Sequence, residues 1–483
     1  MRKIGFVILI LTLVFAVGCG GSSSSTPPPT PTTKTPVAEC IQFLDNSFFF
    51  GTVRLADVKI GGTTLGGSAV NVAPLAVNAG PVSTNPQTNV AYTTVQVCTP
   101  GSTTSCVTIP NVAVDTGSSG LRIPASLVSS LNLPNVYLNS ITPASGGSSN
   151  GSELASSVPI HVMGDTSIPT GNSIPTTCSQ VPTSTGSTTT GQEEDDVAHL
   201  GANGLLGVGN YIYDCDVVGN AQAGVNACSS ASTPPPGTYY TCSSSSCTPA
   251  LVPAAQQVRN PVSLFTDNNG VILKLQNVAV GGLPTATGTM VFGIGTQSNN
   301  GLGSAVVLTL DSNFNDPAWS GFTTVFPVGG VSYPNSTENN LLLANNSYSI
   351  GSFLDSGSNG IFFLDQPTSG ITDCSGSSLN FYYCPATSPD SLQATNQATG
   401  GNSSLVQFSV SAANTLSFAT NTAFSDLAGP NTPQNPGNPS SLQKAADGYF
   451  DWGLPFFYGR NVYTAIQGVT PPSGVQAGPW WAY

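Results

Sequence analysis

The sequence predicts an all-β fold with a few short helices, and three observations support this prediction. Stretches rich in β-branched residues, some with strict alternation as in residues 92–97, recur from residue 47 onward and are separated by turn residues. The 53 Gly and 38 Pro occur together with 39% hydrophobic residues, a mixture that fits many short strands joined by turns. Helical periodicity is nearly absent, and short helices are predicted only at residues 124–131, 260–267 and 390–399.

The N-terminal residues have the pattern of an export signal. Two basic residues precede an apolar stretch that ends at Val17, which is too short for a permanent membrane anchor. The next residues complete a sequence similar to a lipobox, in which Cys19 is lipidated and becomes the new N-terminus. We therefore predict a lipoprotein signal peptide at residues 1–18, followed by the lipidated Cys and a Ser/Pro/Thr tether at residues 19–37. The alternative is a soluble secreted protein that is cut near the same place.

Lipidation predicts a cell envelope protein that is held by acyl chains and does not cross the membrane. Gly20, rather than Asp, after the Cys resembles the pattern of lipoproteins sent to an outer membrane. Cleavage removes Arg2 and Lys3, which leaves 8 Lys and Arg against 23 Asp and Glu. This negative charge makes nucleic acid and anionic lipid headgroups poor partners, so we expect membrane contact through the lipid anchor only, and a monomer.

The cysteine count agrees with export. Lipidation of Cys19 leaves ten of the 11 Cys, an even number that can pair in an oxidising compartment. The connectivity stays open, although four pairs are close enough in sequence to close local loops: Cys98/Cys106, Cys215/Cys228, Cys242/Cys247 and Cys374/Cys384. We predict neither a metal site nor a cofactor, because no Cys-x-x-Cys occurs and the two His are not spaced with Cys as zinc ligands usually are.

Two segments each place an Asp at the end of an apolar run. Asp115 lies in NVAVDTGSSGL (residues 111–121), and Asp355 lies in GSFLDSGSNGI (residues 351–361). A carboxylate at a strand end is held rigidly, Gly permits a tight turn, and neighbouring hydroxyls can hydrogen-bond the carboxylates. The residues predicted to support the two carboxylates in this way are Thr116, Gly117, Ser118, Ser356, Gly357 and Ser358.

Two such loops, if brought face to face, suit peptide hydrolysis. Two carboxyl groups at close range cannot both ionise, so the pair holds one proton. The charged member can take a proton from water while the protonated member donates one to the substrate carbonyl. One Asp-Ser/Thr-Gly is commonly an Asx turn, but here each Asp is followed by an apolar element with a Gly. These elements lie at residues 203–209 and 450–457, with Gly207 92 residues after Asp115 and Gly453 98 residues after Asp355.

The repeated motifs resemble those of the pepsin-like aspartic peptidases over about residues 89–468. The resemblance implies a two-lobed fold with double-psi-type β lobes, an N-terminal lobe at residues 38–300 and a C-terminal lobe at residues 301–483. It implies Asp115 and Asp355 as the catalytic pair, a polypeptide substrate or peptide ligand, and no cofactor. It further implies that an apolar segment passes beneath each Asp loop, formed by Leu205, Leu206 and Gly207 in the first lobe and by Trp452 and Gly453 in the second.

The sequence also departs from the family pattern. Ser356 stands where the family has Thr, and Asp451 replaces an apolar residue. Tyr137 is the one aromatic residue between residues 122 and 206, and it lies early for the substrate-covering flap of the family. Residues 37–88 have no counterpart, and we expect an added strand pair there.

Three functions remain open at this stage. The first is an envelope-tethered aspartic endopeptidase, the second is a catalytically inactive protein that binds a peptide or glycan, and the third is a structural lipoprotein. A Ser-His-Asp hydrolase is disfavoured, because neither His161 nor His199 accompanies a Gly-x-Ser-x-Gly elbow. The acidic residues 193–196 lack the alternate spacing of a calcium loop and are interpreted as a solvated turn.

Overall fold

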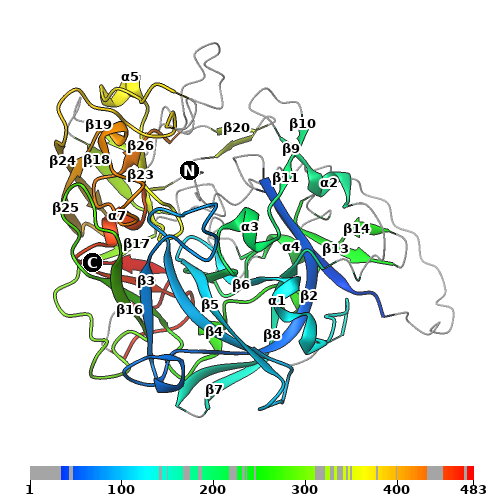
Figure 1. Cartoon of the computed structure of the whole chain (residues 1–483). Coiled ribbons are helices and arrows are strands. Elements are labelled where there is room, and N and C mark those ends of the chain that lie inside the picture. Colours follow the sequence, from blue (N-terminus) through cyan, green and yellow to red (C-terminus); the bar gives the residue numbers. More distant parts are fainter. Residues whose placement is uncertain are drawn as a thin grey trace.

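The computed structural model confirms the all-β prediction (Figure 1). Each α-helix of the described chain is a single turn of four residues: α1 (Ala125–Val128), α2 (Thr176–Ser179), α3 (Val197–Leu200), α4 (Ala227–Ser230), α5 (Gln366–Ser369) and α7 (Leu454–Phe457). The predicted signal peptide and Cys19 lie outside the described residues, as does most of the tether. The structure describes residues 34–42, 47–140, 144–149, 151–165, 167, 174–182, 188–216, 226–230, 234, 237–243, 246–310, 321–326, 331–333, 341–343, 346–348, 351–376, 379–398, 400–431, 450–472 and 476–483.

Six strands close into a barrel. Neighbouring strands pair in the ring order β2, β4, β5, β12, β6, β8 and back to β2. All of these pairs are antiparallel except β5 with β12 and β6 with β8. Alternating β-branched residues such as Val95 and Val97 point into the barrel and are fully buried. The barrel strands are β2 (Ser47–Ile60), β4 (Ala91–Cys98), β5 (Cys106–Asp115), β6 (Ser119–Pro124), β8 (Ser152–Met163) and β12 (Leu205–Val208).

The barrel continues through β4 into a run of strands that includes the C-terminus of the chain. The pairing order is β4, β3, β16, β15, β28, β29, β17. Strands on both sides of residue 300 therefore share one sheet, in which β28 near the C-terminus pairs with β15. The added strands are β3 (Val72–Val77), β15 (Gly270–Leu275), β16 (Ala286–Phe292), β17 (Val307–Thr309), β28 (Asn461–Ala465) and β29 (Trp480–Ala482).

Two four-stranded sheets form the part of the molecule drawn at the upper left of Figure 1. The first has the order β22, β27, β23, β26, and the second has the order β19, β18, β24, β25. Aromatic side chains pack between them; for example, the ring of Phe363 on β23 meets that of Phe408 on β25 edge-on, with 5.6 Å between the ring centroids. The strands are β18 (Thr323–Phe326), β19 (Val331–Tyr333), β22 (Phe353–Leu354), β23 (Ile361–Phe363), β24 (Asp390–Gln397), β25 (Ser403–Val410), β26 (Ala428–Gly429) and β27 (Phe450–Trp452).

One predicted helix is wrong. Residues 390–399 were expected to be helical, but Asp390–Gln397 is β24, which pairs along its whole length with β25. Its burial alternates, because Ala394 and Asn396 are buried while Ser391 and Gln393 are exposed. Tertiary pairing thus outweighs the helix propensity of Leu, Gln and Ala in this segment. The predictions at residues 124–131 and 260–267 are met by α1 with a following 3₁₀ turn and by a 3₁₀ turn at Pro261–Leu264.

The expected strand pair before the family-like region is present. β1 (Val37–Gln42) pairs with β2, and on its other side with β13 (Tyr239–Cys242). β2 is at the same time a barrel strand, so the pair is part of the core fold. The remaining short strands are β7 (Ser145–Ser149), β9 (Gln180–Pro182), β10 (Thr188–Thr190), β11 (Gln192–Glu193), β14 (Cys247–Pro249), β20 (Leu341–Leu343) and β21 (Asn346–Tyr348).

All four local cysteine pairs are confirmed as disulfides: Cys98–Cys106, Cys215–Cys228, Cys242–Cys247 and Cys374–Cys384. A fifth disulfide joins Cys40 of β1 to Cys178 of α2, 138 residues apart. Five disulfides indicate an oxidising, extracytoplasmic compartment. Within the part of the chain that the structure describes, no helix has the length and apolar character that membrane crossing requires.

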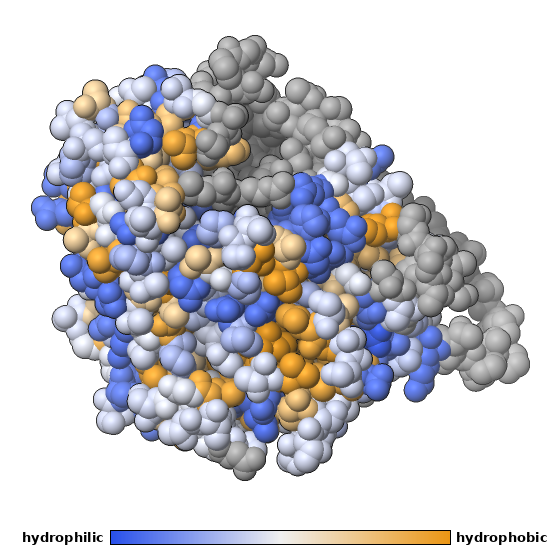
Figure 2. Space-filling model, viewed as in Figure 1, coloured by the Kyte–Doolittle hydropathy of each residue, from blue (hydrophilic) through white to orange (hydrophobic). Residues whose placement is uncertain are grey.

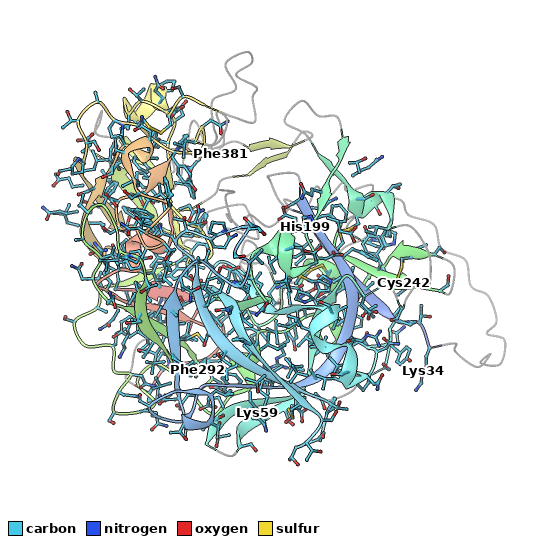
Figure 3. All side chains as sticks on the ribbon, in the orientation of Figure 1. Lys34, Lys59, His199, Cys242, Phe292 and Phe381 are labelled. Carbon is cyan, nitrogen blue, oxygen red and sulfur yellow. A yellow bond between two sulfur atoms is a disulfide. The ribbon has the colours of Figure 1, made fainter. Side chains whose placement is uncertain are left out.

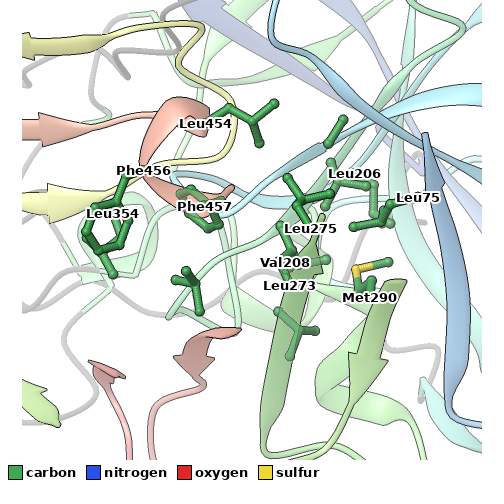
Figure 4. Close-up of a cluster of buried hydrophobic side chains, with 14 of the residues drawn as sticks. Leu75, Leu206, Val208, Leu273, Leu275, Met290, Leu354, Leu454, Phe456 and Phe457 are labelled. Carbon is green, nitrogen blue, oxygen red and sulfur yellow. The ribbon is translucent and has the colours of Figure 1, made fainter. Parts of the chain in front are cut away.

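One continuous core supports both Asp-bearing strands (Figure 4). It contains Leu206 and Val208 of β12, Leu354 of β22 and the two Phe residues of α7, Phe456 and Phe457. Leu354 immediately precedes Asp355, while Leu206 lies beside the strand that ends at Asp115. The two carboxylates are therefore anchored in the same hydrophobic core, although 240 residues separate them in sequence.

Candidate active site

The structure brings the two predicted Asp residues together at the ends of their strands. Asp115 is the last residue of β5, Asp355 follows β22 directly, and both are completely buried. β12 lies between β5 and β6, with Gly207 beside Asp115. β27 lies in the same way between β22 and β23, which brings Gly453 beside Asp355. The predicted segments at residues 203–209 and 450–457 therefore support the two loops as expected.

Glycine is required where these segments pass the loops. A Cβ at Gly207 would lie 2.7 Å from the backbone carbon of Ser118, and a Cβ at Gly453 would lie 2.1 Å from the carbonyl oxygen of Gly360. Neither separation is possible without moving backbone. The Gly residues thus allow the close approach that fixes the two Asp loops.

Thr116 and Ser356 connect the two loops reciprocally. The Thr116 N–H donates to Ser356 Oγ at 3.1 Å, and the Ser356 N–H donates to Thr116 Oγ1 at 2.9 Å. Each hydroxyl then donates to the strand behind the opposite loop, to Leu354 O at 3.0 Å and to Val114 O at 2.8 Å respectively. The prediction that these hydroxyls bond the carboxylates is thereby corrected: they hold the loops to each other. The signal for this is absent from either motif alone, because each partner lies in the other motif.

The carboxylates receive their hydrogen bonds from the next residues along. The N–H groups of Gly117 and Gly357 donate at 2.7 Å to Oδ1 of the preceding Asp. Ser118 Oγ donates to Asp115 Oδ2, and Ser358 Oγ lies 3.0 Å from Asp355 Oδ2. Every residue predicted to support the pair is therefore at the site. These bonds fix the orientation of both carboxyl planes.

The two carboxyl groups face each other. A Cβ at Gly117 would lie 2.7 Å from Asp355 Oδ1, and a Cβ at Gly357 would lie 2.7 Å from Asp115 Oδ1. Burial raises the pKa of Asp355 well above its usual range, and the negative charges of Asp115 and Asp451 raise it further. Two carboxyls buried at this range do not both ionise readily, so the pair favours a state that holds one proton between them, which is the protonation state that general acid–base chemistry on a water requires.

A match to a family of proteins covers this entire site. The family model described as "Protein of unknown function (DUF3443)" matches residues 67–483. The chain belongs to the DUF3443 family. A comparison with curated proteins gives no match. The DUF3443 match includes both Asp loops and both segments beneath them, whereas β1 and β2 precede it. The folded body of this DUF3443 protein thus begins before the matched region, because β2 completes the barrel.

A buried cluster of charged groups in the DUF3443 protein holds β1 to the barrel. Arg122 of β6 contacts Glu39 of β1 at 3.0 Å and Asp214 at 3.2 Å. His161 Nδ1 lies 2.8 Å from Glu39 Oε2, and burial lowers the pKa of His161 well below its usual range. The Arg122 guanidinium also donates to the carbonyl oxygen of Ser119, which lies in the strand that follows the first Asp loop. We assign this cluster a structural role in seating the N-terminal strand.

The acidic residues 193–196 of this DUF3443 chain include two exposed carboxylates. Hydrophilic side chains gather over β11 and α3 (Figure 2), where Glu193 and Asp196 are exposed. Asp196 caps α3 by accepting the N–H of His199, whose ring Nδ1 lies 2.7 Å from Asp196 Oδ2. Figure 3 labels His199 on this helix. Among the described residues, no group of three or more His, Cys, Asp or Glu is arranged to hold a metal ion.

Tyr137, the aromatic residue that lies early in the sequence for a flap, contacts the N-terminal part of the described chain. Tyr137 forms a bridge with Pro36, and the ammonium group of Lys34 lies 5.6 Å from its ring. The hairpin of β7 and β8, which follows it, packs on the 3₁₀ turn at Pro261–Leu264. Tyr137 thus anchors the start of the described chain.

Proposed function

We propose that this protein is an envelope-tethered aspartic endopeptidase. The observation that carries the proposal is the pair of buried carboxyl groups, Asp115 and Asp355, held face to face by the reciprocal bonds between Thr116 and Ser356. This arrangement needs neither a nucleophilic side chain nor a metal to activate water.

In the proposed reaction the pair acts as base and acid on a single water. One ionised Asp takes a proton from the water as its oxygen attacks the peptide carbonyl, and the other Asp donates its proton to the carbonyl oxygen. The tetrahedral intermediate then breaks its C–N bond as the amine takes a proton from the pair. The backbone N–H bonds from Gly117 and Gly357 keep both carboxyl groups aligned through this exchange.

The resemblance to pepsin-like peptidases extends the proposal to fold and substrate. We infer two lobes that meet at the Asp pair, and an extended polypeptide as the substrate class. The barrel with its β5–β12–β6 crossing and the matching β22–β27–β23 crossing support two lobes of similar design. We also propose Cys19 as the lipid anchor and the outer membrane as the location, because the lipobox-like sequence and tether precede a disulfide-bonded body.

One observation favours a second candidate, a catalytically inactive binding protein of the same fold. Both carboxyl groups are completely buried, whereas a peptidase must admit water and a peptide bond to them. Tyr137 contacts Lys34 and does not serve as a flap, which also favours a binding protein. In this second function the fold is kept and a peptide or glycan is held without being cut.

Cleavage of a denatured protein mixture tests the two candidates. The full chain, purified in mild detergent, is assayed across acid to neutral pH beside Asp115→Asn and Asp355→Asn, with and without a statine-type transition-state mimic. We expect peptide products from the parent alone, and their loss with the mimic. Folded, disulfide-bonded parent protein that yields no products at any pH would overturn the peptidase proposal. Binding of the same peptides without cleavage would establish the second function.

A further inference from the structure

A third carboxyl group is connected to the Asp pair through one serine side chain of the second loop. Ser358 Oγ lies 3.0 Å from Asp355 Oδ2 and 2.6 Å from Asp451 Oδ2. All three side chains are buried, with Asp451 5% exposed. Asp451 lies on β27, one residue before the position that pairs with Leu354. The second Asp loop therefore has an acidic neighbour that reaches it through one hydroxyl.

The first loop has no such neighbour at the corresponding position. Parallel pairing aligns Leu205 with the residue two before Asp115, and it aligns Asp451 with the residue two before Asp355. Leu205 is buried and apolar and offers no hydrogen-bond acceptor in its side chain. The Ser118 hydroxyl therefore donates to the Asp115 carboxylate and is not shared with a second carboxyl at this position. The two halves of the site thus differ by one carboxyl group.

The effect of this extra carboxyl group follows from the single hydrogen of the Ser358 hydroxyl. A serine hydroxyl has one hydrogen and can donate it once, while its oxygen can still accept. Ser358 therefore donates to one carboxyl and accepts from the other. The 2.6 Å contact to Asp451 has the length typical of an O–H···O⁻ bond, and the 3.0 Å contact to Asp355 is longer. We assign the donated hydrogen to Asp451, which leaves Ser358 Oγ as an acceptor for a proton on Asp355.

We propose that Asp451 is a positioning residue that turns the Ser358 hydroxyl away from Asp355, so that Asp355 keeps the proton of the pair. Asp115, which accepts two hydrogen bonds, is then the base, and Asp355 is the acid. The charges that act on Asp355 in this arrangement come from Asp115 on β5 and Asp451 on β27. As a consequence, the pH range in which Asp355 keeps its proton, and in which the pair is active, extends toward neutral pH. The assignment of acid and base rests on the proposed peptidase function, whereas the location of the proton does not.

The test replaces Asp451 by the residue found at the corresponding position of the first loop. In Asp451→Leu the Ser358 hydroxyl is free to donate to Asp355, so Asp355 loses its proton at lower pH. We expect the alkaline limb of the kcat/KM profile to move down by about one pH unit or more, since the charge of a neighbouring carboxylate has effects of this size. Asp451→Asn keeps the size and removes the charge, and it should move the limb in the same direction if the Leu variant does not fold.

A matched control is Asp426→Asn, which changes another buried carboxyl of the same region. Asp426 accepts from Ser411 and from the N–H of Gly281, and its loss should leave the position of the alkaline limb unchanged. Titration of ¹³C-labelled Asp carboxyls by NMR gives a readout without turnover, with the Asp355 signal assigned through Asp355→Asn. If the parent cuts no peptide but Asp451→Leu still lowers the pKa of Asp355 in the NMR titration, the peptidase function fails and the positioning role stands. An unchanged Asp355 titration in both folded Asp451 variants overturns the positioning role.

Discussion

The backbone N–H of Thr116 donates to the hydroxyl of Ser356, and the backbone N–H of Ser356 donates to the hydroxyl of Thr116. The four groups are buried, so each bond satisfies a donor that water cannot reach. Because the two residues lie in different loops, these bonds align the Asp pair more directly than any contact within one loop. The two hydroxyl residues of the motifs are therefore the physical link between the halves of the site.

Removing this link should lower the stability of the protein and disturb the alignment of the Asp pair. In Thr116→Val the Ser356 N–H loses its acceptor inside the protein, and we expect the free energy of unfolding to fall by about 1–3 kcal/mol. Ser356→Ala takes the acceptor from the Thr116 N–H and should have a similar effect. The double variant should lose less than the sum, because both bonds join the same two loops and the second change acts on a link that the first has already loosened. Chemical denaturation of the three variants measures this.

The control for these variants is Thr108→Val, which removes an exposed hydroxyl that accepts from Gln96 at 3.2 Å. Its effect should stay within about 0.5 kcal/mol. Strict additivity of the Thr116 and Ser356 changes would mean that the reciprocal bonds carry no coupling.

Asn89 makes a second link between distant parts of the chain. Its side-chain NH₂ donates to the carbonyl oxygens of Asn359 and Phe424, both at 2.9 Å, and its Oδ1 accepts from the Phe424 N–H and from the Tyr458 hydroxyl. Asn359 follows Ser358 in the second Asp loop. Asn89→Gly keeps the positive φ of 52° accessible but removes all four bonds, so we expect a loss of about 2–4 kcal/mol in denaturant unfolding.

Asn111 provides the matched control for this change. It has the same φ of 52°, is only half-buried, and lies at the start of the first Asp motif. Asn111→Gly should be close to neutral, because Gly accepts this backbone conformation readily. Equal losses at the two positions would assign the effect at Asn89 to the backbone and not to its four bonds.

The sequence allowed prediction of those features that depend on local pattern. The Asp loops, the two apolar segments with Gly, and four disulfides that span at most 13 residues are all local signals. The segment at residues 390–397 was misassigned because its residue types suit a helix, and only its pairing with β25 makes it a strand.

Contacts between distant residues were not predictable from one sequence. The bonds between Thr116 and Ser356 span 240 residues, and the partner of Cys40 is 138 residues away. Asp451 was visible as a departure from the family pattern, but its contact with Ser358 depends on the crossing of β27 beneath the loop. The composition of a motif gives the groups that are present, whereas the fold decides which of them meet.

The long-range disulfide should contribute more stability than a local one. Cys40–Cys178 closes a loop of 138 residues, and loop entropy predicts a contribution of about 5 kcal/mol to the free energy of unfolding. Cys242–Cys247 closes a loop of 5 residues, for which the same relation gives about 2 kcal/mol. Paired Cys→Ala substitutions at each bridge, compared by denaturant unfolding, measure the difference. A larger loss from removing Cys242–Cys247 would contradict the expectation.

Glu153 should make the protein less stable as pH rises toward neutrality. Its side chain is completely buried, accepts the Thr266 N–H at 2.8 Å and lies near the buried Asp267. Burial raises the pKa of Glu153 from 4.5 to about 7, and the neighbouring Asp267 adds to the shift. An acid with a raised pKa favours the folded state while protonated, so its contribution is complete below pH 4.5 and is lost as pH rises through about 7.

Thermal unfolding of the parent and of Glu153→Gln at pH 4.5, 6 and 8 tests this expectation. Gln keeps an oxygen for the Thr266 N–H and remains neutral at every pH, so its Tm should fall less than that of the parent between the lowest and highest pH. Comparing the change in Tm of one protein with that of the other cancels the pH dependence that their remaining groups share. If the two proteins lose the same Tm over this range, ionisation of Glu153 does not contribute to the pH dependence of stability, and the expectation is wrong.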